Sequence, residues 1–122
     1  ALNPMFSLKE TLNFHDKMCG FTPGVDLDRW IHEAWLTPHL NKRIKTYSSG
    51  MKQRVRLLLA IASPRPVLLL DEPTSNLDKE GVELYKRMIQ ELATEKTIIV
   101  ASNYVAHEYD FCSGELLLEK HY

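Results

Sequence analysis

The chain has 122 residues, the length of one small domain or of part of a larger one. Hydrophobic residues make up 44% of the sequence and charged residues 25%, which excludes a disordered chain and predicts a packed core. Fifteen Lys and Arg residues against 16 Asp and Glu residues leave a net charge of -1. No overall positive field therefore attracts nucleic acid or anionic lipid, and we expect no nucleic-acid partner.

Cysteine content and hydropathy narrow the class of protein further. Cys19 and Cys112 are too few for a disulfide framework, and no C-x-x-C pair is present for zinc or redox chemistry. We expect both to be buried, small side chains in a reducing compartment. The longest apolar run, 57–62, is far shorter than the roughly 20 residues that cross a bilayer. Because the chain begins with Ala1 and not with Met, we expect that a cut produced this end.

The first half of the chain predicts three helices. Ser7 followed by Glu10 is a capping-box pattern, and apolar residues then recur at helical spacing. Asp26 can cap a second helix that is expected to end near Thr37, and Pro64 stops a third. The three expected helices are 8–19, 26–37 and 50–63.

The second half predicts a strand, a helix and a second strand. The apolar run 67–70 and the β-branched run 97–101 are typical of strands that are buried on both faces. Apolar spacing over 82–92 predicts a helix between them, which makes a parallel crossover unit. A short helix around 104–110 and an edge strand at 115–119 complete an α/β fold.

Two carboxylates follow the first predicted strand. Asp71 and Glu72 would lie at the carboxyl end of a parallel strand, where open α/β sheets bind ligands. A carboxylate there can hold Mg²⁺, which prefers one or two carboxylates together with waters and phosphate oxygens. Glu72 projects differently and could act as a base toward water. The alternative interpretation is a turn that caps the next helix.

Two serines stand at the start of the third predicted helix. Free backbone N–H groups and the positive end of the helix dipole favour an anion there, and the hydroxyls of Ser48 and Ser49 suit phosphate. The alternative is that one of these serines only caps the helix.

Together these segments resemble the nucleotide-binding domains of ABC ATPases. The motifs that they resemble occur in the family's order: the signature motif at 47–51, the Walker B strand at 67–72, the D-loop at 75–78 and the strand that leads to the switch position at 97–103. The resemblance implies a partial domain of the P-loop NTPase type. Its parts would be a helical subdomain over 1–47 and the parallel-sheet, C-terminal half of the ATPase core over 48–122.

The resemblance also implies roles for individual residues. ATP and Mg²⁺ would be bound between two ATPase subunits arranged head to tail. The residues of the signature motif would contact the partner's nucleotide: Ser48, Ser49, Gly50 and Met51. The remaining site residues would be Asp71 for the magnesium ion, Glu72 for the attacking water, Asp78 for coupling of the two sites and Asn103 at the switch position. The implied function is ATP hydrolysis that energises transport through separate transmembrane permease subunits, at the inner, cytoplasmic face of the cell membrane.

The sequence departs from the family pattern in three places. No G-x-x-x-x-G-K-[ST] motif occurs, so we expect a fragment that binds ATP very weakly alone. Asn103 stands where the family usually has histidine, and asparagine cannot carry a proton near neutral pH, so we expect slow hydrolysis. Ser49 and Met51 replace the common glycine and glutamine, a variant that is similar to transporters including the haem-exporter type of cytochrome c maturation.

Two other functions remain open at this point. One is a soluble ABC protein of translation or DNA repair, which tandem ATPase domains in the parent would favour. The other is a degenerate interaction module without ATPase activity, and a P-loop encoded in frame upstream would exclude it.

Two His-Glu pairs and two tryptophans are the remaining candidates for functional residues. His32-Glu33 and His107-Glu108 each lack the second histidine of a zinc motif, and we expect all four to be exposed helical residues. We expect the two tryptophans of the second helix, Trp30 and Trp35, to serve packing, with a contact to membrane subunits as the alternative for Trp35.

Overall fold

Three capped helices occupy the first half of the chain in the computed structural model, which describes residues 2–116. They are α1 (Leu8–Met18), α2 (Leu27–Glu33) and α3 (Ser49–Ile61). The predicted capping box is confirmed, because the Ser7 hydroxyl accepts from the Glu10 amide at 3.1 Å and the Glu10 carboxylate accepts from the Ser7 amide at 3.0 Å. Asp26 caps α2 in the same way by accepting from the amide of Arg29 at 3.1 Å.

Helix α2 is shorter than predicted. It ends at Glu33, and Trp35 follows with a φ of 62°, a left-handed conformation that no right-handed helix can contain. The predicted end near Thr37 was therefore wrong, and the chain continues through two 3₁₀ turns, η1 (Thr37–His39) and η2 (Ile44–Thr46). The turn also separates the two tryptophans: Trp30 is buried as predicted, whereas Trp35 is 66% exposed.

The second half forms the predicted parallel crossover. Strands β1 (Val67–Asp71) and β2 (Thr97–Ala101) pair in parallel from Val67 opposite Thr97 to Asp71 opposite Ala101, and α4 (Lys79–Leu92) connects them. A single turn of helix, α5 (Ala106–Tyr109), follows β2. Most of the strand predicted at 115–119 lies outside the described residues, and 115–116 form no strand.

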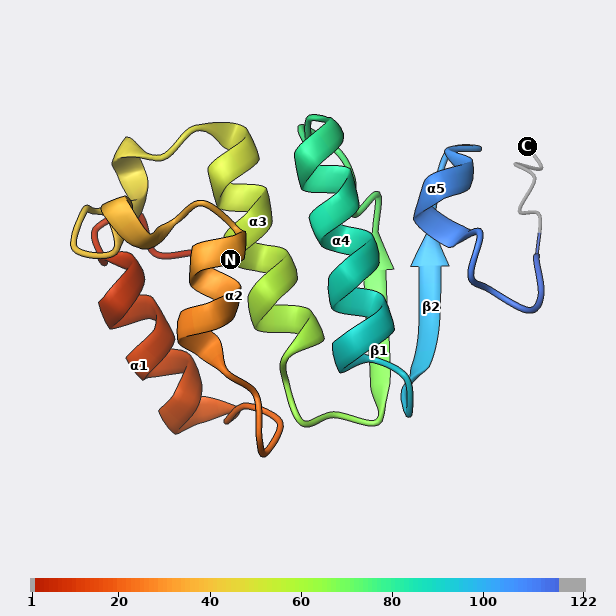
Figure 1. Cartoon of the computed structure of the whole chain (residues 1–122), viewed down its shortest axis with the longest axis horizontal. Helices are drawn as coiled ribbons and strands as arrows, with labels where there is room; N and C mark the ends of the chain where they lie inside the picture. Colours follow the sequence, from red (N-terminus) through yellow and green to blue (C-terminus); the bar gives the residue numbers. More distant parts are fainter. Residues whose placement is uncertain (1, 117–122) are drawn as a thin grey trace, which may run out of the picture.

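Helix α3 lies at the centre of the packing. It contacts α1 on one side and α4 on the other, and α4 lies in front of β1 (Figure 1). Because α3 has neighbours on two sides, both Leu57 and Leu58 are buried, and one hydrophobic core runs through all of these elements. The helices of 1–47 and the crossover unit therefore share one core through α3.

The two strands are covered on one face only by the described residues. Leu68 and Leu70 are buried, while Val67 and Leu69 of the same strand and Ile99 of β2 point to the other face and are about half or more exposed. The prediction that both faces are buried is therefore wrong for residues 2–116. Asp71 lies at the end of this open face, in alternation with Leu69.

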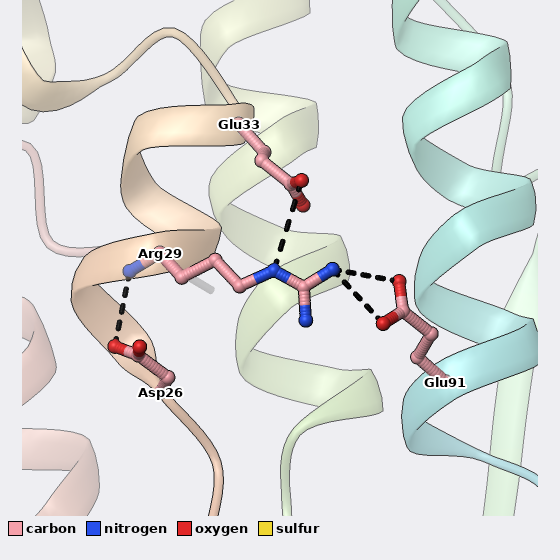
Figure 2. Close-up of polar contacts among 4 residues, drawn as sticks. All are labelled: Asp26, Arg29, Glu33 and Glu91. Atoms are coloured by element: carbon pink, nitrogen blue, oxygen red, sulfur yellow. Dashed lines mark hydrogen bonds and ion pairs between the residues drawn. The ribbon is translucent and has the colours of Figure 1, made fainter.

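A charged contact joins α2 to α4. The guanidinium of Arg29 donates to both carboxylate oxygens of Glu91 at 2.9 Å and lies 3.7 Å from the Glu33 carboxylate (Figure 2). Its carbon Cζ also lies 4.7 Å from the centre of the Trp30 ring. The hydrogen bonds that Arg29 donates to Glu91 are the main cause of the raised pKa of Arg29. The contact links α2 directly to α4.

The cysteines were predicted wrongly. Cys19 is exposed because it caps the C-terminus of α1, Cys112 is half-buried, and both are free thiols. Within residues 2–116, no helix combines the length and the apolar character that a membrane span requires.

Candidate functional site

Glu72 occupies an unusual backbone position directly after β1. Its φ is 43°, and its amide donates to the carbonyl of Ala101 at 2.8 Å, which extends the strand pairing by one residue. Its carbonyl then accepts from the amide of Ser75 at 3.0 Å, so the chain turns sharply after the strand. A left-handed glutamate costs on the order of 1–3 kcal/mol, and such strain concentrates at functional sites. The carboxylate is exposed at the carboxyl end of the sheet, where the sequence placed it.

Asn103 follows β2 and faces the same cavity as Glu72. The cavity has a volume of about 360 Å³ and is open to solvent. Its remaining lining residues come from the loop after β1, from α4 and from the segment at α5: Thr74, Ser75, Leu77, Val82, Val105, His107 and Glu108. Both loops contain further left-handed residues, Asn76 at 65° and Tyr104 at 60°. The structure therefore brings together the two residues that were predicted to be catalytic.

Asp71 does not line this cavity, because it belongs to the open face of the sheet. It is exposed, and the described residues contain no group of three or more His, Cys, Asp or Glu side chains that could hold a metal. A single accessible carboxylate fits Mg²⁺, which keeps most of its waters and takes one or two carboxylates together with phosphate oxygens. It does not fit zinc, which is held by three or four protein ligands.

The signature segment, residues 47–51 where the sequence predicts the signature motif, leads into the first turn of α3. Ser48 caps the helix, and its hydroxyl accepts from the amide of Met51 at 3.1 Å. The capping alternative is therefore observed, although a serine hydroxyl that accepts one hydrogen bond can still donate its own hydrogen. Ser48 and Ser49 are exposed, and Gly50 and Met51 are half-buried. All four residues lie together at the start of the helix, as predicted.

The first turns of α3 are fastened to the loop that follows β1. The side-chain amide of Gln53 donates to the carbonyl of Pro73 at 2.9 Å, and Arg54 lies 3.5 Å from the carboxylate of Asp78. Asp78 also caps α4 by accepting from the amide of Gly81 at 2.8 Å. Asp78 therefore contacts both α3 and α4. Together with the Gln53–Pro73 hydrogen bond, this contact connects the first turns of α3 to the loop that carries Glu72.

Glu108 was not predicted to belong to the site, but it is the most buried charged side chain there. It is only 2% exposed, so the prediction of an exposed helical residue was wrong for it, and the neighbouring His107 is half-buried. One carboxylate oxygen accepts from the Thr74 amide at 2.8 Å and from its hydroxyl at 2.6 Å, and the other accepts from the Ser102 hydroxyl at 2.5 Å. No local pattern signals this burial, because it depends on Thr74, which lies 34 residues away in the loop after β1.

The ionisation of Glu108 follows from these contacts. Burial raises its pKa, but the hydrogen bonds from Ser102 and Thr74 outweigh burial and hold the pKa below the ordinary range of a glutamate. The buried hydroxyl of Tyr85, whose pKa is raised by burial and by Glu108, donates to the Glu108 carbonyl at 2.6 Å. The carboxylate is thus a charged, fully paired group between the loops after β1 and β2.

The chain is similar in sequence to known proteins. A family model described as "ABC transporter" matches residues 1–75, which is more than half of the chain. The chain is 33% identical over 116 residues to the uncharacterized ABC transporter ATP-binding protein YdbJ of Bacillus subtilis (strain 168), a match that covers 93% of this chain and 36% of that protein. It is 31% identical over 109 residues to the lantibiotic transport ATP-binding protein SrtF of Streptococcus pyogenes, covering 75% of this chain and 48% of that protein. The chain thus spans between about a third and a half of these relatives.

Solved structures share the fold. The chain matches a structure described as the ATP binding subunit of an ABC transporter with a TM-score of 0.73 and 24% identity, covering 87% of this chain and 46% of that chain. It matches an archaeal ribosome recycling factor, solved with a ribosomal stalk protein, with a TM-score of 0.68 and 22% identity over 88% of this chain and 20% of that chain. A fold of the P-loop NTPase type, together with the family match over 1–75, identifies this chain as a member of the ABC transporter ATP-binding family.

Proposed function

We propose that this chain supplies the signature motif, the Walker B strand, the D-loop and the switch region of an ATP-hydrolysing subunit of an ABC transporter. The observation that carries the proposal is the cavity at the carboxyl end of the sheet. Asn103 and Glu72, whose backbone is left-handed, both line this cavity. Residues 1–47 are the helical subdomain in this proposal, and 48–122 belong to the ATPase core. A P-loop, which the sequence lacks, would come from another segment of the ATPase.

Each site residue has a chemical role in this proposal. The exposed carboxylate of Glu72 accepts a hydrogen bond from the attacking water, and the amide of Asn103 donates from the other loop of the cavity. Mg²⁺, when bound, neutralises phosphate charge, and Asp71 would supply its carboxylate ligand. The carboxylate of Asp78 would couple the two nucleotide sites of the dimer through α3 and α4, which it joins.

The signature segment would serve the nucleotide of a second ATPase subunit in a head-to-tail dimer. The hydroxyl of Ser48 accepts from Met51, and among the described residues its own hydrogen has no assigned acceptor, so it can donate to a phosphate oxygen. Ser49 and Gly50 present backbone N–H groups in the first helical turn, where the helix dipole also favours an anion.

Transport is the process that we infer for the complete protein. The two curated relatives described above are named as an ABC transporter ATP-binding protein and a lantibiotic transport ATP-binding protein, and both names support a subunit that works with transmembrane permeases. Such a subunit would lie at the inner, cytoplasmic face of the cell membrane. The exposed Trp35, at a cavity of about 430 Å³ beside α4, would be available for a contact with the permease.

The test is ATP hydrolysis by the complete ATPase subunit, with this segment and a P-loop in one chain. Glu72→Gln is expected to lower kcat by about 100-fold, since general-base contributions begin near that size. Glu95→Gln, which neutralises an exposed carboxylate in the turn before β2, is the matched control and should leave kcat unchanged. Wild-type hydrolysis by the Glu72→Gln variant would overturn the proposed function.

A further inference from the structure

The carboxylate of Glu108 joins the two loops that carry the proposed catalytic pair. Its three hydrogen bonds connect it to Thr74, two residues after Glu72, and to Ser102, the residue before Asn103. The carboxylate is 2% exposed and lies between the carboxyl ends of β1 and β2. Its position relative to both loops is therefore determined by direct, short contacts.

The proton positions in this network follow from the charge of Glu108. An ionised carboxylate only accepts, so the hydroxyls of Thr74 and Ser102 must both donate to it. The Thr74 hydroxyl, 3.0 Å from Nε2 of His107, then accepts from that nitrogen, and the Ser102 hydroxyl accepts from the amide of Val105 at 3.2 Å. With Glu108 ionised, each hydroxyl thus accepts from one donor and donates to the carboxylate; the Val105 carbonyl, 3.5 Å from the Ser102 hydroxyl, is the more distant alternative acceptor.

The backbone of Glu108 is held in place by a contact with α4. Tyr85 of α4 donates its buried hydroxyl to the Glu108 carbonyl at 2.6 Å, and its ring packs edge-on against Phe111 at 6.3 Å between centroids. The α5 segment therefore cannot shift without breaking a buried hydrogen bond to the long crossover helix. A movement of the Thr74 loop relative to the Ser102 loop would break at least one charge-assisted bond, and such bonds are about twice as strong as neutral ones.

We propose that Glu108 is a positioning residue for ATP hydrolysis: its carboxylate holds the Thr74 and Ser102 loops together and so sets the spacing of Glu72 and Asn103 across the cavity. This inference rests on the proposed function. Glu108 does not touch the reacting atoms, and it acts through the two loops. Misplacement of catalytic groups by about 1 Å can cost on the order of 100-fold in rate, so a group with this geometric role controls kcat.

Glutamine is the informative substitution because it has the same size but the wrong polarity. Three donors surround the carboxylate, whereas a glutamine presents one acceptor oxygen and an NH₂ group that is itself a donor. Glu108→Gln in the complete subunit is therefore expected to lower kcat at least about tenfold while the KM for ATP changes by less than about twofold. Asp110→Asn is the matched control: it neutralises an exposed carboxylate two residues away and should leave both constants unchanged.

Two measurements separate positioning from a purely structural role. Ser102→Ala removes one donor and leaves the pairing with Thr74, so it should lower kcat per folded subunit in the same direction, with a smaller loss. In an Asn103→Ala background, the loss caused by Glu108→Gln should be smaller than in the wild type, because one of the two positioned groups is absent. The Ser102→Ala variant also provides the answer if Glu108→Gln does not fold.

The outcomes are distinct. A large loss with Glu72→Gln together with wild-type kcat in Glu108→Gln, or in Ser102→Ala if Glu108→Gln does not fold, overturns this inference and leaves the proposed function standing. A lower melting temperature with unchanged kcat per folded subunit makes Glu108 purely structural, which also overturns it. No loss with Glu72→Gln overturns the proposed function and the inference together.

Discussion

A Cβ atom added to Gly50, in the first turn of α3, would lie 2.9 Å from the carbonyl oxygen of Asn76. This carbonyl cannot withdraw easily, because the loop is tied to α3 through Gln53 and Arg54 and Asn76 itself has a left-handed backbone. The first turn of α3 and the loop 75–78 therefore pack as one unit. Glycine is required at position 50 by packing within the chain, in addition to the phosphate contact that we propose for it.

Gly50→Ala is expected to destabilise the chain. Alanine in a helix is ordinarily more stable than glycine by about 1 kcal/mol, but here the added methyl group overlaps a backbone oxygen, and overpacking costs about 1–3 kcal/mol. We expect the overpacking cost to exceed the helix gain, so the free energy of unfolding, measured by urea titration, should fall by about 1–2 kcal/mol.

Gly114→Ala is the control for this experiment. Gly114 has no heavy atom within 4 Å of the added Cβ and no left-handed backbone, so its substitution should leave the unfolding midpoint unchanged. A Gly50→Ala variant that is as stable as the wild type would contradict the close contact with Asn76.

Local patterns predicted the elements well and the contacts between them poorly. The capping box of α1, the apolar run of β1 and the β-branched run of β2 are determined by neighbouring residues, and each was found where it was predicted. The burial of Glu108 depends on hydroxyls 34 and 6 residues away, and no periodicity encodes such a pairing. The early end of α2 depends in the same way on a left-handed residue, Trp35, that no glycine or proline signals.

The positions of the predicted site residues followed from the sequence because neighbouring residues in the chain determine them. Asp71 ends β1 and Glu72 follows it directly, so their place at the carboxyl edge follows from the strand itself. The open face of the sheet could not be foreseen, since Val67 and Leu69 have the composition of a strand that is covered on both sides.

Acid should weaken the contribution of Glu108 to stability. Its folded-state pKa lies below the ordinary value of 4.5, so the folded chain binds fewer protons than the unfolded chain in that region. The stabilisation is fully present above pH 4.5 and is lost as the pH falls through the folded-state pKa. At neutral pH, Glu108→Gln should cost about 1–3 kcal/mol, the range for a buried hydrogen bond to a charged group.

Urea unfolding of the wild type and of Glu108→Gln between pH 7 and pH 3 measures this effect. The difference between their free energies of unfolding should be largest near neutral pH and should shrink below the ordinary glutamate pKa of 4.5. Glu10, whose pKa is lowered by its hydrogen bonds with Ser7, titrates in both proteins and cancels from the difference. A difference that grows toward acid would mean that Glu108 is neutral in the folded chain.

The 122-residue chain alone is expected to bind ATP only weakly. It provides the first turn of α3 and the carboxylates after β1, but its sequence contains no G-x-x-x-x-G-K-[ST] loop to surround the phosphates with amides and a lysine. Titration calorimetry of Mg-ATP into the chain should therefore give no low-micromolar affinity. A heat signal at that affinity would show that residues 1–122 suffice for binding, and a Ser48→Ala variant would then test the α3 site.

Asn103→His should accelerate hydrolysis by the complete subunit. The amide of Asn103 can donate a hydrogen bond into the cavity that it shares with Glu72, but it cannot take up or release a proton near neutral pH, whereas an imidazole can do both. Because one acid–base group contributes about 100-fold or more, we expect kcat to rise by about tenfold, with part of the gain lost to imperfect geometry. Asn41→His makes the same substitution in an exposed turn of the first half of the chain. It is the matched control and should leave kcat unchanged. If Asn103→His also leaves kcat unchanged, the rate is limited by a step other than proton transfer, and asparagine at the switch position is not the cause of slow turnover.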